Sequence, residues 1–224
     1  MSCHEKGETK MPRLQISLVI ANIQKRPNIQ ALIATALGMG VTSILIVGQP
    51  KLELDINNGN TTGSATIALY LRKCLISLDS DHYPNKESSS TSPPQPPRGK
   101  AYLRRFARWN DCIAYLRQHS ILLAGVEIDS RAITVKELLN QITVRSQGQP
   151  QKEEEATTTL LALVMGNEGQ GLSATQIQDC DLLVRLPQYG VGTASYNVYV
   201  AASLVLQRLH QYQTTTMATM TRYN

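Results

Sequence analysis

The sequence predicts an α/β protein built on a parallel sheet. Its 224 residues contain five apolar runs of strand length, and segments with helical spacing lie between them. The runs show little polar alternation, which is typical of parallel strands covered on both faces. Glycine-rich turns follow the last two runs. The five runs are Leu14–Ala21, Val41–Gly48, Ile121–Val126, Leu160–Met165 and Asp181–Leu186.

The first three elements predict a βαβ unit. Leu14–Ala21 is the first strand, and Asn28 can act as the N-cap of a helix that Gly38 and Gly40 end. Val41–Gly48 then supplies the second strand. Because no GxGxxG turn follows the first strand, the pattern disfavours a dinucleotide-dependent enzyme.

The middle of the chain combines helical segments with a low-complexity insertion. Ala65–Leu78 has helical spacing, and Trp109–Gln118 is a second helical segment. Between them, Asp79–Gly99 is rich in serine and proline and almost free of apolar residues, so we expect a disordered insertion within the domain.

Two further helix starts and one long helix complete the domain. Thr134 and Glu137 have the spacing of a capping box for a helix that reaches about Ile142, and Ser173 can cap a short helix. We expect a disordered leader at 1–12, one domain at 13–212 and a flexible tail at 213–224. The last helix of the domain follows Ser195 and presents Val198, Ala201, Ala202, Val205 and Leu209 at helical spacing.

Composition favours a polyanionic partner and excludes several classes. The net charge is +5, and the 4 cysteines and 4 histidines are scattered without a CxxC pair. We therefore expect no metal site and no disulfide framework. No apolar run approaches the roughly 20 residues that span a membrane. The first residues lack the apolar segment of a secretory signal, so we expect an intracellular protein, cytoplasmic or nuclear.

A basic cluster with interleaved aromatic residues follows the insertion. Cations can contact phosphates and aromatic rings can stack on bases, so the cluster is a candidate RNA-binding surface. The alternative is a solvated helix face whose aromatic side chains turn into the core. The cluster comprises Arg98, Lys100, Arg104, Arg105 and Arg108, with Tyr102, Phe106 and Trp109 between them.

The candidate site lies in the C-terminal third, where two glycine-rich turns interrupt the strand and helix pattern. Gly166–Gly171 has three glycines in six positions, and Gly190 and Gly192 lie in a second turn. Turns of this composition let the backbone approach a ligand closely. We therefore place the chemistry between Leu160 and Ala202.

These segments carry a resemblance to a known family. LVMGNEGQGLS, VRLPQ and SYNVYVAASLVL resemble motifs 2 and 3 of the SpoU (TrmH-like) branch of the SPOUT methyltransferases. The resemblance implies a parallel-sheet α/β SPOUT fold with a deep C-terminal trefoil knot. It also implies an S-adenosylmethionine-dependent methyltransferase that modifies a ribose 2′-hydroxyl of tRNA or rRNA and acts as a homodimer.

The resemblance also implies roles for individual residues. Asn28, Glu168, Ser195 and Asn197 match motif positions near the reacting groups, although Glu168 could instead support its loop and Ser195 could cap the last helix. RNA binding is expected of Lys25, Arg26, Arg104, Arg105 and Arg108. The expected cofactor-binding residues are Ala124, Gly125, Gly166, Asn167, Gly171, Leu186, Gln188, Ser195 and Tyr196.

Motif 1 departs from the family at its arginine. Ala34 stands at the position where the family has an arginine that activates or grips the substrate, often across the dimer interface. Lys25 and Arg26, in the turn before Asn28, are the nearest candidates to replace that cation, and Arg26 suits phosphate contact better. The alternative for these two residues is that both only face solvent. The alternative is an RNA-binding paralogue that has lost turnover. The rest of motif 1 is present at Asn28, Thr35, Ala36, Gly40 and Val41.

Overall fold

The fold is a single parallel sheet of eight strands covered by helices, as predicted. The computed structural model describes residues 13–23, 25–49, 52, 65–78, 95–147, 158–167, 169–190 and 195–221. The strand order is β3-β4-β2-β1-β7-β5-β8-β6. The elements are β1 (Arg13–Ala21), α1 (Arg26–Gly38), β2 (Ser43–Val47), α2 (Ala65–Cys74), β3 (Leu75–Leu78), β4 (Ala101–Phe106), α3 (Trp109–Gln118), β5 (Leu122–Val126), β6 (Ile133–Thr134), α4 (Val135–Gln147), β7 (Thr158–Met165), α5 (Ala174–Asp179), β8 (Leu182–Arg185) and α6 (Val198–Thr221).

The chain changes direction across the sheet next to β1. It builds β2, β3 and β4 on one side of β1, and then β5, β6, β7 and β8 on the other. β1 pairs in parallel with both β2 and β7, so the carboxyl ends of strands from the two halves meet there. In open parallel sheets, ligands bind at the carboxyl edge where the strand order reverses.

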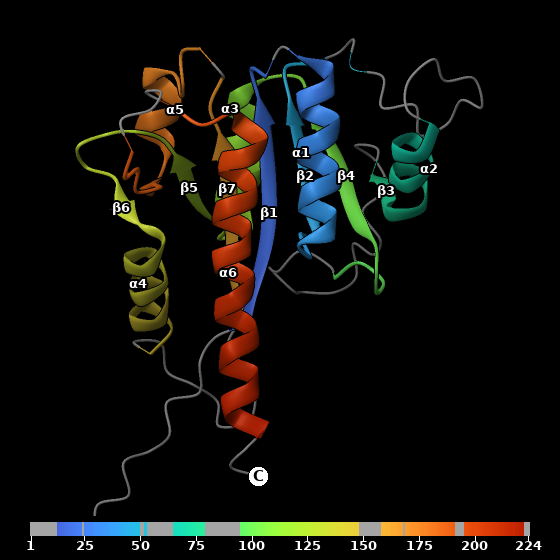
Figure 1. The fold of residues 1–224 in the computed structure, drawn as a ribbon. Helices are drawn as coiled ribbons and strands as arrows, with labels where there is room; N and C mark the ends of the chain where they lie inside the picture. Colours follow the sequence, from blue (N-terminus) through green and yellow to red (C-terminus); the bar gives the residue numbers. More distant parts are fainter. Residues whose placement is uncertain are drawn as a thin grey trace, which may run out of the picture.

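Alternating side chains of the central strand feed two hydrophobic cores. Leu18 and Ile20 belong to the core under α1, α4 and α6, whereas Val19 and Ala21 belong to the core under α3 and α5. In Figure 1, α1 and α6 lie side by side in front of the sheet and α3 lies behind it. Each fully buried leucine or isoleucine contributes roughly 1.5–3 kcal/mol, so both faces of the sheet stabilise the fold.

Polar contacts fix α3 to the turn between α5 and β8. Trp109 Nε1 donates to Asp179 Oδ2 at 2.6 Å, and Arg117 Nη1 donates to Asp181 Oδ1 at 2.6 Å. The other oxygen of Asp181 accepts from the Leu123 backbone N–H at 2.8 Å. These bonds set the start of β8 relative to β5, and so position the two strands that end at the site.

Two helix starts differ from the prediction. α1 begins at Arg26 with Lys25 as its N-cap, so Asn28 lies in the first turn and is not the cap. Pro27 explains the earlier start, because proline is favoured in the first helical turn.

The long C-terminal helix is capped by Asn197 rather than by Ser195. Asn197 Oδ1 accepts from the Tyr199 backbone N–H at 3.2 Å, and the Asn197 carbonyl accepts from the Ala201 N–H at 2.9 Å. This contact satisfies a backbone donor at the helix start, which is the physical role of a cap. The predicted caps at Ser173 and at Thr134 with Glu137 are confirmed.

Three element lengths also differ. The predicted helix over Ala65–Leu78 ends at Cys74, and Leu75–Leu78 pairs with β4 as an edge strand. That pairing joins residues separated by the insertion, so local spacing did not show it. α4 continues to Gln147, beyond the predicted end near Ile142. α6 continues to Thr221, so the predicted tail at 213–224 is largely helical.

Several predictions concern residues that the structure does not describe. The leader at 1–12 and residues 79–94 of the insertion lie outside the described residues. Residues 191–194 of the segment that would form the knot also lie outside them, and the knot stays a prediction. Among the helices that are described, none is long and apolar enough to cross a membrane.

Candidate functional site

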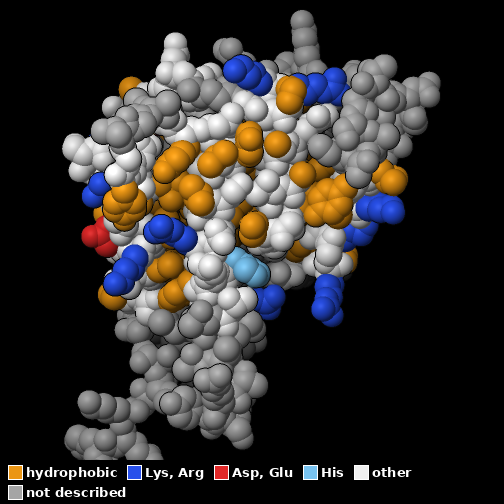
Figure 2. Space-filling view, viewed as in Figure 1, with side chains coloured by type: hydrophobic (Ala, Val, Ile, Leu, Met, Phe, Trp, Pro, Cys, Tyr) orange, Lys and Arg blue, Asp and Glu red, His pale blue; other side chains and the backbone are white. Residues whose placement is uncertain are grey.

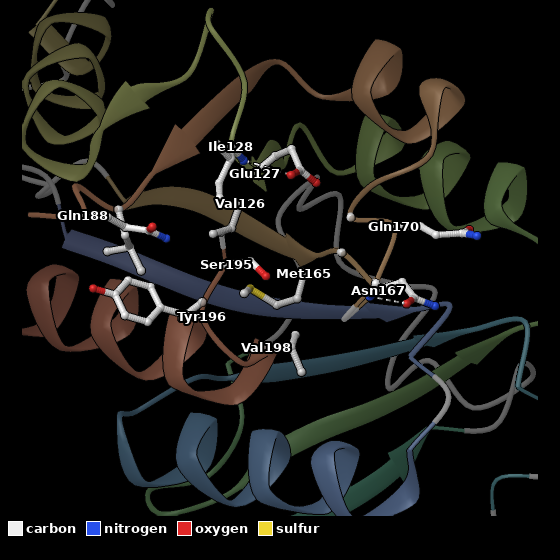
Figure 3. A pocket seen from close by; sticks show the side chains of 15 residues that line it. Val126, Glu127, Ile128, Met165, Asn167, Gln170, Gln188, Ser195, Tyr196 and Val198 are labelled. Carbon is white, nitrogen blue, oxygen red and sulfur yellow. Dashed lines mark hydrogen bonds between the residues drawn. The ribbon is translucent and has the colours of Figure 1, made fainter. Parts of the chain in front are cut away.

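A cavity of about 330 Å³ lies at the carboxyl ends of β5, β7 and β8. Figure 3 shows the Met165 and Ser195 side chains near its middle and Gln188 and Tyr196 toward one end. Most of the predicted cofactor-binding residues converge here although three separate segments carry them. Those that line the cavity are Gly166, Asn167, Gly171, Leu186, Gln188, Ser195 and Tyr196.

The glycine loop after β7 folds back on itself and forms one wall. The Asn167 N–H donates to the Gly171 carbonyl at 2.9 Å, and the Gly171 N–H donates to the Asn167 carbonyl at 3.0 Å. The Asn167 side chain completes the turn, because its Oδ1 accepts from the Gly169 N–H at 2.9 Å. Its Nδ2 donates to the Asn22 carbonyl at 2.9 Å, which fixes the loop to the end of β1.

Glu127 is a site residue that the sequence reasoning missed. Its side chain lines the cavity, Oε2 accepts from the Leu172 N–H at 2.6 Å, and Oε1 accepts from the Ile128 N–H at 2.9 Å. The carboxylate therefore links the end of β5 to the glycine loop. An acidic residue directly after a buried parallel strand was the signal that could have identified it.

Replacing Glu127 with alanine should loosen this loop. The Leu172 N–H would lose its acceptor, and an unsatisfied, partly buried donor costs about 1–3 kcal/mol. We expect a decrease of that order in the free energy of unfolding measured with urea, and faster hydrogen exchange at the Leu172 amide. Glu127→Gln is the control, because it keeps an acceptor oxygen for Leu172. Unchanged Leu172 exchange in Glu127→Ala would contradict this role.

Ala124 and Gly125 do not line the cavity. Both lie within β5, and a Cβ added to Gly125 would meet side chains of Leu172, Cys180 and Leu183. β5 continues to Val126, and the residues that form this wall of the cavity are the three that follow Gly125, namely Val126, Glu127 and Ile128.

The residues predicted to act in catalysis do not all lie at the cavity. Ser195 lines the cavity, whereas Asn197 is engaged in capping α6. Asn28 is half-buried in the first turn of α1 and does not line the cavity. Arg26 is exposed at the start of the same helix. Glu168 lies outside the described residues.

The basic cluster lies on β4 and in the turns before and after it. Neighbouring residues of a strand point to opposite faces, so Arg104 and Arg105 do not share one surface. The Arg104 guanidinium lies 4.8 Å from the Tyr115 ring centroid, and Arg105 Nη2 donates to the Leu52 carbonyl at 2.9 Å. Arg108 is exposed and pairs with Asp111 at 3.3 Å. The lysine and arginine at positions 25 and 26 are exposed at the carboxyl edge of the sheet.

Two of the interleaved aromatic residues are partly buried against the protein core. Phe106 and Trp109 pack against the core under α3, and the Phe106 ring lies 5.5 Å from that of Tyr115. This packing agrees with the alternative of aromatic side chains turned into the core for these two residues. They extend from a strand and from the start of a helix rather than from one helix face.

None of the three cysteines that the structure describes lines the cavity. Burial raises the pKa of Cys112 to about 12. Burial, followed by the nearby Asp181 and Asp179 carboxylates, raises the pKa of Cys180 to about 12 despite the opposing charge of Arg117. A thiol with such a pKa is almost entirely protonated at neutral pH. No cluster of three or more potential metal ligands occurs among the described residues.

Comparison with known proteins gives one family match and a set of structural neighbours. Residues 98–207 match the family described as SpoU rRNA Methylase. AviRb from Streptomyces viridochromogenes, a SpoU methyltransferase solved with AdoMet, is 16% identical, with a TM-score of 0.56 over 95% of this chain and 63% of that chain. An AdoMet-bound rRNA methyltransferase from Sinorhizobium meliloti is 14% identical, with a TM-score of 0.51 over 91% and 58% of the two chains.

A third neighbour is more similar in length. The A. aeolicus TrmH/SpoU tRNA modifying enzyme is 15% identical, with a TM-score of 0.53 over 92% of this chain and 77% of that chain. The chain thus spans less than two thirds of the length of AviRb and of the Sinorhizobium enzyme. At these identities the similarity shows the fold. The comparison with curated proteins gives no match.

Proposed function

We propose, on the premise that residues 98–207 form a SpoU methylase domain, that this protein is an S-adenosylmethionine-dependent RNA methyltransferase. The acceptor is a ribose 2′-hydroxyl of tRNA or rRNA. The observation that carries the proposal is the convergence of seven motif residues on one cavity at the carboxyl edge of the sheet. The fold similarity to SpoU methyltransferases solved with AdoMet supports the same cofactor here.

The cavity fits such a cofactor in size and in the character of its lining. Its volume of about 330 Å³ lies within the range of small-molecule pockets, roughly 300–1,000 Å³. Val126, Met165 and Leu186 provide apolar surface, and the Gly166–Gly171 backbone provides close polar groups. Gln188 and Ser195 add hydrogen-bonding side chains.

Methyl transfer requires alignment more than covalent participation by the protein. S-adenosylmethionine supplies an electrophilic methyl group on a sulfonium, and the new C–O bond forms as the S–C bond breaks. The rigid glycine loop and the start of α6 hold the two sides of the cavity, which restricts the approach of the acceptor oxygen. The proton of the hydroxyl must leave as the bond forms, and Ser195 is the described motif residue whose hydroxyl lines the cavity.

Cofactor binding is the first experiment. Titration calorimetry should detect binding of S-adenosylhomocysteine at micromolar concentrations, because the product retains the groups that the cavity contacts. Absence of heat with folded protein at high-micromolar concentration would reject the cofactor. Transfer of labelled methyl groups to RNA from cells lacking the gene then tests the reaction. A 2′-O-methylated linkage resists alkaline cleavage, which identifies the position modified.

We also propose that the protein is a homodimer formed through α1 and α6. Figure 2 shows apolar side chains gathered on the face that these helices present. Leu37 and Met39 are only partly buried there, and Tyr199 is 37% exposed. Apolar side chains gathered on one exposed face are typical of an interface.

Light scattering should therefore give twice the monomer mass of 24.7 kDa at micromolar concentration. Leu37→Glu places a charge on the proposed interface and should shift the mass toward the monomer. Ala114→Glu is the matched control, because Ala114 is exposed on α3, which covers the opposite face of the sheet. A monomeric parent would reject the dimer.

A second function remains supported by one residue. Ala34 lacks the cation that motif 1 of the family carries, which favours an RNA-binding protein without turnover. Both functions predict the same cofactor cavity. Only the methyltransferase would transfer methyl groups to RNA in the assay, whereas the RNA-binding protein would not.

A further inference from the structure

A second cavity, of about 480 Å³, opens at the carboxyl ends of β1 and β2. It shares Asn167, Gln170 and Gly171 with the first cavity, so the folded glycine loop forms a wall common to both. In Figure 3, Gln170 points away from the centre of the first cavity. A ligand in the second cavity would therefore lie next to one in the first, with the Asn167–Gly171 turn at the boundary.

The lining of the second cavity is unusually rich in side-chain amides. Asn22, Gln49, Asn167 and Gln170 contribute four amide groups, and Ser173 adds a hydroxyl. No charged side chain belongs to its lining within the described residues. A neutral set of paired donors and acceptors matches the edge of a nucleobase, which asparagine and glutamine recognise through bidentate hydrogen bonds. It does not match a phosphate.

The hydrogen bonds within the protein show which amides can bind a ligand. Asn167 uses both ends of its amide to hold the glycine loop. Its side chain therefore forms part of the cavity wall and does not bind the ligand. Gln49 donates Nε2 to the Ile23 carbonyl at 3.0 Å, which fixes the side chain and leaves Oε1 as an acceptor. The Asn22 side chain makes no hydrogen bond within the described residues, and Asn22 adopts a left-handed φ of 60°.

We propose that this second cavity binds the base of the nucleotide whose ribose is methylated, with Gln49 and Asn22 reading the edge of that base. The inference rests on the proposed function. A base can enter a lined cavity only after it leaves its stack, so the substrate is a nucleotide in a single-stranded or loop region of RNA. Lys25 and Arg26 follow Asn22 in the same turn at the rim, where the phosphates of such a nucleotide would lie.

Direct titration with ribonucleosides tests the inference without relying on turnover. Adenosine, guanosine, cytidine and uridine are added separately to protein saturated with S-adenosylhomocysteine, which keeps adenosine out of the first cavity. Ligand-observed NMR measures the affinities. We expect one nucleoside to bind more tightly than the others, and Asn22→Gly and Gln49→Met each to weaken it about tenfold, as for loss of a base-edge contact.

The variants are chosen to preserve the fold. Glycine accepts the left-handed backbone of Asn22, and methionine keeps the length of Gln49. Gln118→Met is the matched control, because Gln118 is an exposed amide at the end of α3, on the opposite edge of the sheet. The control should leave nucleoside affinity unchanged. Both test variants should bind S-adenosylhomocysteine as the parent does.

Three outcomes would overturn the inference. They are absence of binding by any nucleoside, equal affinity in the parent and in both test variants, and displacement of the nucleoside by inorganic phosphate. Failure of the proposed function is a separate result, seen as no heat with S-adenosylhomocysteine or no methyl transfer to RNA. If the product does not bind, the titration of unliganded protein still decides the inference through the dependence on Asn22 and Gln49.

Discussion

Gly166→Ala should weaken cofactor binding strongly, whereas a neighbouring alanine substitution should have little effect. A Cβ at residue 166 would lie 2.5 Å from the Gly171 carbonyl carbon and 2.7 Å from the Leu172 nitrogen. Both are backbone atoms of the folded loop, so the methyl group can be accommodated only if the loop opens. The two Asn167–Gly171 hydrogen bonds would then be lost together with the wall of the cavity. We expect the affinity for S-adenosylhomocysteine to fall by about 100-fold or more, since loss of two or more polar contacts costs about 1–1.5 kcal/mol each.

Gly169→Ala is the matched control for this prediction. It lies in the same loop, but the nearest atom to its added Cβ is Asn167 Oδ1 at 3.9 Å, which is ordinary van der Waals contact. We expect calorimetry to give an affinity within threefold of the parent. Overpacking also destabilises folded proteins, typically by 1–3 kcal/mol, so urea denaturation must show that Gly166→Ala is folded at the assay temperature. Parent-like affinity in folded Gly166→Ala would contradict the placement of the cofactor against this loop.

The sheet was predictable because its strands are buried on both faces. Such strands appear as continuous apolar runs, and Leu14–Ala21 and Leu160–Met165 each became a strand within two residues of the predicted bounds. The edge strand Leu75–Leu78 was not predictable in this way, because its partner Ala101–Arg104 lies beyond the insertion. Local spacing records helix and strand periodicity but not pairing between distant segments.

The cavity was predictable where glycine spacing and motif residues coincide. Gly166, Leu186 and Ser195 are far apart in sequence, yet each follows or precedes an element that ends at the same edge of the sheet. Glu127 was missed because a single acidic residue after a strand has many possible roles. Its contact with Leu172 depends on how the glycine loop packs against β5, which is a property of the three-dimensional structure.

The residue that caps α1 was also not predicted correctly from the sequence. The sequence pattern predicted Asn28 as the cap of α1, but the helix begins earlier, at Arg26, where Pro27 occupies a favourable position in the first turn. Asn28 is therefore a half-buried residue of the first helical turn and does not cap the helix. Its motif role stays a prediction.

Arg26→Ala should reduce the rate of methyl transfer by about 100-fold or more if Arg26 replaces the missing motif 1 arginine, as expected for loss of a charge that stabilises the reacting groups. Arg26 is the first residue of α1, at the carboxyl edge where both cavities open. Ala34 lies eight residues further along the helix, about 12 Å away along its axis at 1.5 Å per residue. The two positions therefore face different surroundings within one protomer, and Arg26 is the one of the two that lies at the carboxyl edge of the sheet.

Three variants separate relocation of the cation from loss of catalysis. Lys25→Ala removes the adjacent exposed cation and should reduce kcat less than threefold, because a planar guanidinium grips a phosphate bidentately whereas an ammonium does not. Arg26→Ala should lower kcat while leaving S-adenosylhomocysteine affinity unchanged, since Arg26 does not line the first cavity. Parent-like turnover in Arg26→Ala would reject relocation to this residue. If the parent has no turnover and Ala34→Arg gains it, the result would instead favour the RNA-binding function. It would mean that the parent lacks only the arginine that the family carries at that position.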